Sequence, residues 1–262
     1  MAGSNHSLHT RELKNFLDQK ADYYNTPTFI PTDPIQVPHQ FDDPCDIEIA
    51  AFLTATIAWG RKASIIENAR RLISLMGEEP CAFLSEAGEE DMKRFLPFVH
   101  RTFNGMDCIY FIRALQRIYR EHGGLGRLFE AEFNRHGDLF HAMVEFRRAF
   151  FSIADPGHTS KHVADPSRGA GGKRLNMFLR WMVRRDGRGV DFGLWRAIPM
   201  DALYIPLDIH TGTVARRLGL LQRRQNDWKA VEELTEVLRK FDPTDPVRYD
   251  YALFGLGSFE EF

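Results

Sequence analysis

Two residues of this chain, Lys173 and Asp208, stand at predicted helix starts and carry side chains that can act together. Lys173 follows the glycine-rich stretch 168–172 and opens an apolar-periodic segment, so we expect it in the first turn of a helix. Asp208 precedes the segment 209–218 and is predicted to be the N-cap of a second helix. The backbone therefore constrains the positions of one amine and one carboxylate.

Each side chain suits a particular chemistry. The positive end of a helix dipole and partial burial both favour the neutral, nucleophilic form of Lys173, and such an amine forms a Schiff base with a sugar carbon. As an N-cap, Asp208 would be bound by backbone N–H groups and held ionised. A fixed carboxylate stabilises positive charge that develops at a sugar C1′. Taken singly, Lys173 also fits a phosphate-contacting or solvent-facing lysine, and Asp208 a purely structural cap.

The glycine-rich turn before Lys173 is a candidate contact for a nucleic-acid backbone. Gly169, Gly171 and Gly172 lack side chains, so the chain can approach a ligand closely there. A helix N-terminus binds phosphate, and a hairpin between two helices can hold a nucleic-acid backbone without reading its sequence. Arg174 and Arg180 add positive charge on the helix that follows. A flexible linker and a solvated helix face are the simpler interpretations of these residues.

The distribution of charge is more informative than its sum. Residues 145–224 contain 15 Lys and Arg against 7 Asp and Glu, a local charge of +8 in a chain whose net charge is −2. A basic segment within an acidic chain is typical of a surface that faces a polyanion, although a set of solvated helix faces gives the same count.

Composition indicates a protein with a sizeable core, in one domain or in two lobes that share a cleft. The chain has 262 residues, of which 44% are hydrophobic. Cys45, Cys81 and Cys108 are far apart, which predicts neither a disulfide framework nor a metal site and fits a reducing cytosol. Residues 1–10 carry no apolar signal region, and no apolar run is long enough for a membrane span. A cytoplasmic location follows as an expectation.

The hydrophobic periodicity predicts an all-α fold without a β-hairpin or a repeat. A long loop at 25–44 is expected to be ordered and either functional or packed across the molecule. The glycine pair at 123–124 should end one helix, and Gly255 and Gly257 should break the last one. Helices are expected at 11–24, 46–59, 64–76, 81–87, 89–95, 106–122, 128–133, 139–151, 173–185, 192–197, 209–218, 227–241 and 245–254.

The two central segments together resemble a known superfamily. Gly169-Ala170-Gly171-Gly172-Lys173 resembles the G-x-G-x-K hairpin of the helix-hairpin-helix DNA glycosylases. Leu207-Asp208-Ile209-His210-Thr211, followed by Arg217 and Leu218-Gly219-Leu220, resembles their V-D-T-H…R-L-G-L segment. In that superfamily the lysine is the Schiff-base nucleophile and the aspartate is its partner, which implies these roles for Lys173 and Asp208.

Within the superfamily the chain looks most like the archaeal 8-oxoguanine glycosylase branch, and it also looks like a bacterial family without an assigned activity. That branch carries an aspartate and, four residues later, an aromatic residue at its base pocket, a spacing that Asp250 and Phe254 match. Trp59 is a further candidate for stacking on a base, or else a core residue. Two segments depart from the pattern: Pro166-Ser167-Arg168 replaces an apolar Leu-Pro, and 55–60 lacks the Ser-Gln pair near the lesion.

The resemblance implies a two-lobed fold with a central cleft, in which residues 1–49 and 173–262 form one lobe and residues 50–172 the other. Double-stranded DNA would lie across the cleft with a damaged base flipped out. Lys173 would attack C1′, giving a monomeric, bifunctional glycosylase and lyase for an oxidised purine such as 8-oxoguanine, associated with the bacterial nucleoid. No organic cofactor and no iron–sulfur cluster are implied, and the fold is compatible with a cation at the hairpin. The alternative is a non-catalytic helix-hairpin-helix module that binds DNA or RNA.

Overall fold

Helices dominate the computed structural model, which describes residues 2–260 and 262 and, for residues 2–9, the backbone only. Helix makes up 67% of the chain and strand 2%, so the all-α prediction is confirmed. The α-helices are α1 (Ala2–Tyr24), α2 (Pro44–Thr56), α3 (Lys62–Ser74), α4 (Pro80–Glu86), α5 (Glu89–Met92), α6 (Gly105–His122), α7 (Leu125–His136), α8 (Leu139–Phe150), α9 (Lys173–Val183), α10 (Ile209–Arg217), α11 (Trp228–Phe241) and α12 (Tyr249–Phe259).

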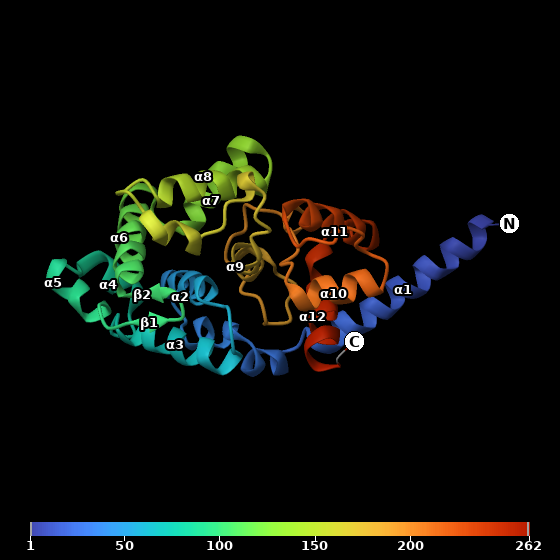
Figure 1. Cartoon of the computed structure of the whole chain (residues 1–262), viewed down its shortest axis with the longest axis horizontal. Helices are drawn as coiled ribbons and strands as arrows, with labels where there is room; N and C mark the ends of the chain where they lie inside the picture. Colours follow the sequence, from blue (N-terminus) through green and yellow to red (C-terminus); the bar gives the residue numbers. More distant parts are fainter. Residues whose placement is uncertain (1, 261) are drawn as a thin grey trace.

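Helix α9 lies in the middle of the molecule and is seen end-on in Figure 1. Helices α2–α8 lie on one side of it and helices α1, α10, α11 and α12 on the other. On the first side α2 packs directly on α9, and on the second α12 packs on both α1 and α10. Every residue of α9 from Leu175 to Val183 is buried, so this helix joins the apolar core of both groups.

The segment between α1 and α2 crosses from one group of helices to the other along the lower edge in Figure 1. It consists of three short 3-10 helices, η1 (Pro27–Thr32), η2 (Pro34–Gln36) and η3 (Pro38–Gln40). Each begins with a proline, whose fixed φ suits the first position of a helix. The predicted ordered loop is thus confirmed as a folded crossing segment.

A two-stranded hairpin is present where none was expected. Strand β1 (Val99–His100) pairs antiparallel with β2 (Phe103–Asn104), with His100 opposite Phe103. The usual signal for such a turn is glycine or asparagine with positive φ, but here Arg101 adopts φ 56°. The turn therefore carried no recognisable sequence signature.

Two helix predictions in the second half of the chain are wrong for identifiable reasons. Residues 192–197 are not helical, because the N–H groups of Phe192 and Trp195 donate to the last carbonyls of α9 instead. Helix α12 continues through both glycines to Phe259. A Cβ at Gly255 would lie 2.2 Å from the Tyr24 ring, so this glycine allows α12 to approach α1 closely rather than ending the helix.

The predicted absence of a disulfide is also wrong. Cys45 at the start of α2 is bonded to Cys81 in α4, with 5.7 Å between their Cα atoms. Asp46 helps to join the two helix starts, because its Oδ1 accepts the Cys81 N–H at 2.7 Å. The cysteine pattern therefore no longer argues for a reducing compartment. Asp43, Cys45 and Cys81 are the one described group of three potential metal ligands, but two of its members are bonded to each other.

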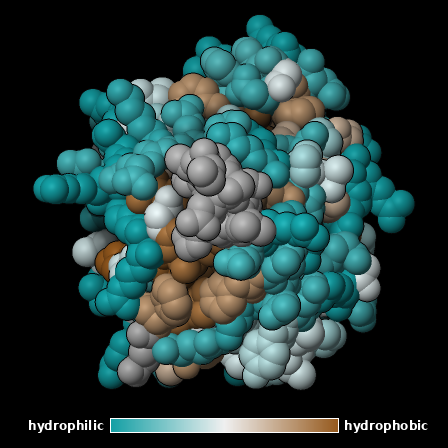
Figure 2. Space-filling view, turned by 90° about the vertical axis from the view of Figure 1, so that its right-hand side faces the viewer, coloured by the Kyte–Doolittle hydropathy of each residue, from teal (hydrophilic) through white to brown (hydrophobic). Residues whose placement is uncertain are grey.

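The surface on the α1 side of the molecule is mostly hydrophilic. Figure 2 shows this face, with its largest hydrophobic area below the centre and smaller ones near the top. Within the part of the chain that is described, no helix has both the length and the apolar character needed to cross a membrane.

Candidate functional site

The glycine-rich turn leads into α9 as predicted, but its surroundings differ from a hairpin between two helices. The element before it, η6 (Pro166–Arg168), is a single 3-10 turn. A backbone hydrogen bond connects the turn to the start of α11, because the backbone N–H of Trp228 donates to the Gly169 carbonyl at 3.0 Å. Residues 167–170 are exposed and available to a ligand.

The three glycines of the turn differ in what the structure requires at each position. Gly172 is the N-cap of α9 with φ 62°, a left-handed conformation that favours glycine. A Cβ at Gly171 would lie 2.7 Å from the Asn226 carbonyl oxygen, so internal packing already requires a glycine there. Gly169 is exposed with φ 86°. Of the three, Gly169 presents its backbone most openly, and its contact with a nucleic-acid backbone stays a prediction.

Asp208 is the N-cap of α10, as predicted. Its Oδ1 accepts the Thr211 N–H at 2.9 Å, and its backbone carbonyl accepts the Gly212 N–H at 2.9 Å. The Asn226 amide donates to the same carbonyl at 2.8 Å. Oδ1 is thus used for capping, while Oδ2 takes no part in the cap.

Oδ2 of Asp208 lies 3.9 Å from Nζ of Lys173, so the two helix starts meet. This distance is too long for a hydrogen bond, and the nearest polar contact of Nζ is the Met177 sulfur at 3.5 Å. The two side chains remain 29% and 20% exposed, so both are accessible without being fully solvated. The geometry leaves the amine free to turn toward a ligand, with a carboxylate at ion-pair distance beside it.

A cavity of about 760 Å³ opens beside this pair. It contains all five residues predicted to act in catalysis or base binding: Lys173, Asp208, Asp250, Phe254 and Trp59. Apolar walls with a few polar groups, in a volume of roughly 300–1,000 Å³, are typical of small-molecule sites. The remaining lining residues are Phe29, Asp33, Pro34, Ala58, Gly60, Lys62, Ile65, Arg174, Met177, Arg180, Pro206, Leu207, Ile209, His210, Asn226, Tyr251 and Ser258.

Trp59 and Arg174 form one wall of the cavity. The Arg174 guanidinium lies 4.6 Å from the Trp59 ring centroid and donates to the Thr56 carbonyl, which fixes it in place. The His162 ring also stacks on Trp59, with centroids 5.7 Å apart. Burial lowers the pKa of Arg174 to about 10. Arg174 is thus part of the cavity wall, and its contact with phosphate stays a prediction.

The prediction that Arg180 contacts the DNA backbone is wrong. Its side chain is buried, and its guanidinium is paired with Asp250 and, at 3.2 Å, with Asp191. Arg180 and Asp250 both line the cavity as an ion pair. Burial raises the pKa of Asp250 to about 6, although the charge of Arg180 opposes this shift.

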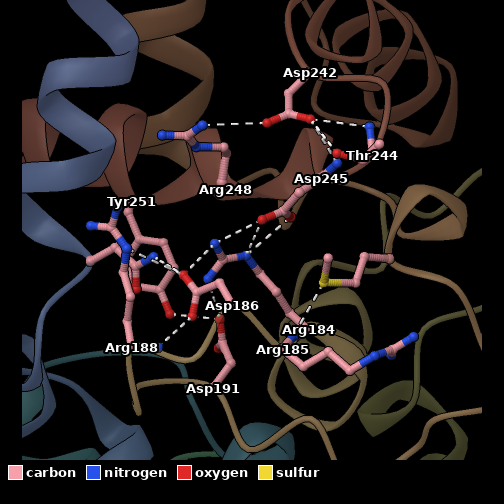
Figure 3. A network of polar contacts seen from close by, with 12 residues as sticks. Arg184, Arg185, Asp186, Arg188, Asp191, Asp242, Thr244, Asp245, Arg248 and Tyr251 are labelled. Atoms are coloured by element: carbon pink, nitrogen blue, oxygen red, sulfur yellow. Dashed lines mark hydrogen bonds and ion pairs between the residues drawn. The ribbon is translucent and has the colours of Figure 1, made fainter.

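Asp191 connects this pair to a buried network of ion pairs and hydrogen bonds, shown in Figure 3. Arg184 lies at its centre, only 1% exposed, and contacts three carboxylates: Asp191 at 3.0 Å, Asp245 at 2.8 Å and Asp186 at 2.8 Å. The Tyr251 hydroxyl donates to Asp191 at 2.8 Å. The network joins α9 to the start of α12 and holds the floor of the cavity.

Replacing Arg184 should destabilise the fold strongly. Arg184→Met keeps most of the side-chain volume but leaves buried carboxylates without their cation, so the free energy of unfolding should fall by about 3–5 kcal/mol. Urea denaturation measures this change. Arg188→Met is the matched control, since the Arg188 side chain is 39% exposed and should contribute less than about 1 kcal/mol. Equal losses in both variants would contradict the importance of the buried network.

Asp250 should make stability depend on pH. Its folded pKa of about 6 exceeds the ordinary value, so between about pH 4 and 6 the folded state binds a proton that the unfolded state has lost. The free energy of unfolding should therefore fall as the pH rises through this window, by roughly 1–3 kcal/mol from this group. Urea denaturation at pH 4.5 and 6.5 should show a smaller fall in Asp250→Asn. An identical pH dependence in the variant would exclude a raised pKa at Asp250.

Two histidines in the segment after α8 are placed against a buried carboxylate. His158 and His162 both face the fully buried Asp107, at 3.0 Å and 3.4 Å, and Thr159 donates to the same carboxylate at 2.7 Å. Burial lowers the pKa of His162 to about 4. The cluster ties the segment after α8 to the start of α6 and supports the ring of Trp59.

Sequence reasoning missed Asp33, Phe29 and Tyr251, all of which line the cavity. Asp33 comes from η1–η2, far from the central motifs, and its proximity depends on the crossing of that segment. An Asp-Pro pair within a long ordered loop was the available signal, because it marks a capped turn.

A model of the family described as "Protein of unknown function (DUF2400)" matches residues 33–259 of the chain. The chain belongs to the DUF2400 family. The match contains every described cavity-lining residue except Phe29, so the cavity of this DUF2400 protein lies almost wholly within the family's span. No curated protein and no solved structure shows a significant match.

Proposed function

We propose that this DUF2400 protein is a base-excision DNA glycosylase with lyase activity that removes an oxidised purine such as 8-oxoguanine. The observation that carries the proposal is the approach of Lys173 Nζ to Asp208 Oδ2, 3.9 Å apart at the edge of a cavity of about 760 Å³. Phosphate binding alone needs neither this carboxylate nor this pocket. An amine, a carboxylate and a cavity together suit covalent chemistry on a flipped nucleotide.

In the proposed reaction the Lys173 amine attacks C1′, and the C1′–N bond breaks with its electron pair leaving on the base. Asp208 stabilises the positive charge at C1′ and accepts the proton that the amine loses. As the C1′–O4′ bond of the sugar ring breaks, the proton held by Asp208 passes to O4′, which gives a protonated imine between Nζ and C1′, and the expelled base takes a proton from water. Loss of a C2′ proton from this imine expels the 3′ phosphate, which is the lyase step.

The arrangement of the helices is compatible with the two-lobed helix-hairpin-helix glycosylase fold that the sequence suggests. In that assignment residues 1–49 and 173–262, including α9, form one lobe and residues 50–172 form the other, so that the assigned boundary falls within α2. Duplex DNA would lie across the cavity opening, with the exposed turn 167–170 against its backbone. The single 3-10 turn before Gly169 is a departure from the usual hairpin.

The test is base release from a panel of duplexes that each contain one lesion, with undamaged duplex as the control. We expect release of an oxidised purine and strand cleavage without alkali treatment. Cleavage only after alkali would limit the activity to that of a glycosylase. Duplex binding without release from any lesion would contradict the proposal and support the non-catalytic DNA- or RNA-binding alternative.

Binding to undamaged duplex should be electrostatic and depend on exposed cations. Arg180 and Arg184 belong to the basic segment 145–224, but their buried ion pairs keep them from contacting DNA. Arg168 in the turn and Arg61 beside the cavity are exposed.

The affinity for duplex DNA should fall steeply with salt, and Arg61→Gln or Arg168→Gln should each reduce the slope of log K against log salt by about 1. Fluorescence anisotropy measures the slope. Arg113→Gln, on α6 at an ion pair with Glu89, is the control. A flat salt dependence would exclude this DNA-facing surface.

A further inference from the structure

The crossing segment supplies the cavity with a carboxyl group that no part of the proposed reaction uses. Asp33 lies between η1 and η2, is 7% exposed and lines the cavity. Its Oδ1 accepts the Ile35 N–H at 2.9 Å and so caps η2. Among the groups that the structure describes, none hydrogen-bonds Oδ2 and no cation lies within ion-pair distance of it.

The capping role does not explain why this residue is an aspartate. A cap needs one side-chain oxygen, which asparagine or serine provides as well. Aspartate adds a second oxygen, and burying a carboxylate without a partner is unfavourable. The two other carboxyl groups of the cavity are engaged, Asp208 with Thr211 and Lys173, and Asp250 with Arg180. Of the three carboxyl groups that line the cavity, Asp33 is the one with no described cation within ion-pair distance.

The surroundings of Asp33 favour its neutral form, because the side chain is buried and no described cation lies within ion-pair distance. Burial raises the pKa of Asp33, while the Ile35 N–H and the charges of Arg180, Lys173 and Lys62 oppose this shift without cancelling it. With Oδ1 already accepting a hydrogen bond, the proton of the neutral acid belongs on Oδ2. A neutral carboxyl is a hydrogen-bond donor, and apolar sites are known to keep an aspartate neutral for this purpose.

The walls around Asp33 suit a flat ligand. Phe29 lies on the same crossing segment and packs edge-on against Tyr251, with ring centroids 5.2 Å apart, and Phe254 lies 6.2 Å from Phe29. Aromatic walls with a few polar groups bind a planar heterocycle and fix its orientation. A donor at Oδ2 would then select a heterocycle that presents an acceptor.

We propose that Asp33 is the residue that selects an oxo-purine in this cavity, by donating a hydrogen bond from Oδ2 to a ring carbonyl oxygen. A purine with an amino group at the same position presents a donor and would face Oδ2–H without a partner. The proposal rests on the proposed function for the identity of the ligand as a nucleobase, but it concerns recognition and not bond breakage.

The test compares two variants that both keep the η2 cap. Asp33→Asn retains a donor, because its oxygen stays on the Ile35 N–H and its NH₂ group points into the cavity. Asp33→Ser retains the cap with a hydroxyl too short to reach the ligand. Binding of hypoxanthine and of adenine, which differ by a 6-oxo and a 6-amino group, is measured by protein NMR titration up to millimolar concentration. Thermal unfolding verifies that both variants are folded.

We expect wild type and Asp33→Asn to prefer hypoxanthine, with affinities within about threefold of each other, and Asp33→Ser to lose about 10- to 100-fold in hypoxanthine affinity. Equal losses in Asp33→Asn and Asp33→Ser would assign an ionised acceptor and overturn the proposal. It would also be overturned if Asp33→Ser kept the preference, or if wild type bound neither base. Oxo-purine binding without base release from any lesion duplex would refute the glycosylase function and leave this inference intact. Base release from a lesion duplex, together with an unchanged preference for hypoxanthine in Asp33→Ser, would support the glycosylase function and refute the role of Asp33.

Discussion

Lys173→Gln should abolish covalent trapping of the protein on lesion-containing DNA and reduce base release on the order of 10³-fold or more. Glutamine has a similar length but no nucleophilic amine, so no imine can form for borohydride to reduce. The variant should still bind duplex DNA, because the exposed turn and Arg61 remain. Single-turnover base release and gel detection of the reduced adduct measure the two effects.

Lys62→Gln is the matched control for this experiment. Lys62 lines the same cavity and is exposed, and its ammonium lies 5.1 Å from the Phe259 ring. Removal of its charge should weaken duplex binding modestly while the adduct persists. Loss of the adduct in Lys62→Gln but not in Lys173→Gln would move the nucleophile to α3.

Asp208→Asn should slow base release by about 10²- to 10⁴-fold, the scale of one acid–base or electrostatic group. Asparagine caps a helix as well as aspartate, so the hydrogen bond to the Thr211 N–H should survive and α10 should keep its position. What is lost is the negative charge beside Lys173. The variant should bind lesion DNA with nearly unchanged affinity.

Asp138→Asn controls for the substitution itself, since Asp138 is the N-cap of α8 and its Oδ1 accepts the His141 N–H at 2.8 Å. It should release base at the wild-type rate. If Asp208→Asn also reacted at that rate, the carboxylate would be only a cap, and its proximity to Lys173 would have no catalytic meaning.

The parts of the site that depend on local sequence were predictable. Gly172 followed by Lys173 marked the start of α9, and Asp208 marked the N-cap of α10, because capping and glycine conformations are local properties. The helical spacing of apolar residues predicted most helices within a few positions. These signals were sufficient to place two reactive groups at helix starts.

The parts that depend on distant partners were not predictable. Arg180 and Arg184 were indistinguishable from surface arginines until Asp191, Asp245 and Asp250 were found beside them. Gly255 was interpreted as a helix breaker. Its actual role depends on Tyr24, which lies at the other end of the chain and packs against it. The Cys45–Cys81 bond required the packing of α4 on α2. In each case the deciding contact joins residues that no local pattern relates.

Borohydride trapping followed by peptide mapping tests the central claim most directly. Wild-type protein is incubated with a duplex that contains 8-oxoguanine, the imine is reduced, and the cross-linked peptide is identified by mass spectrometry. The proposed mechanism predicts a covalent adduct on Lys173 that is absent with undamaged duplex. No adduct with any lesion duplex, or an adduct on another residue, would contradict it.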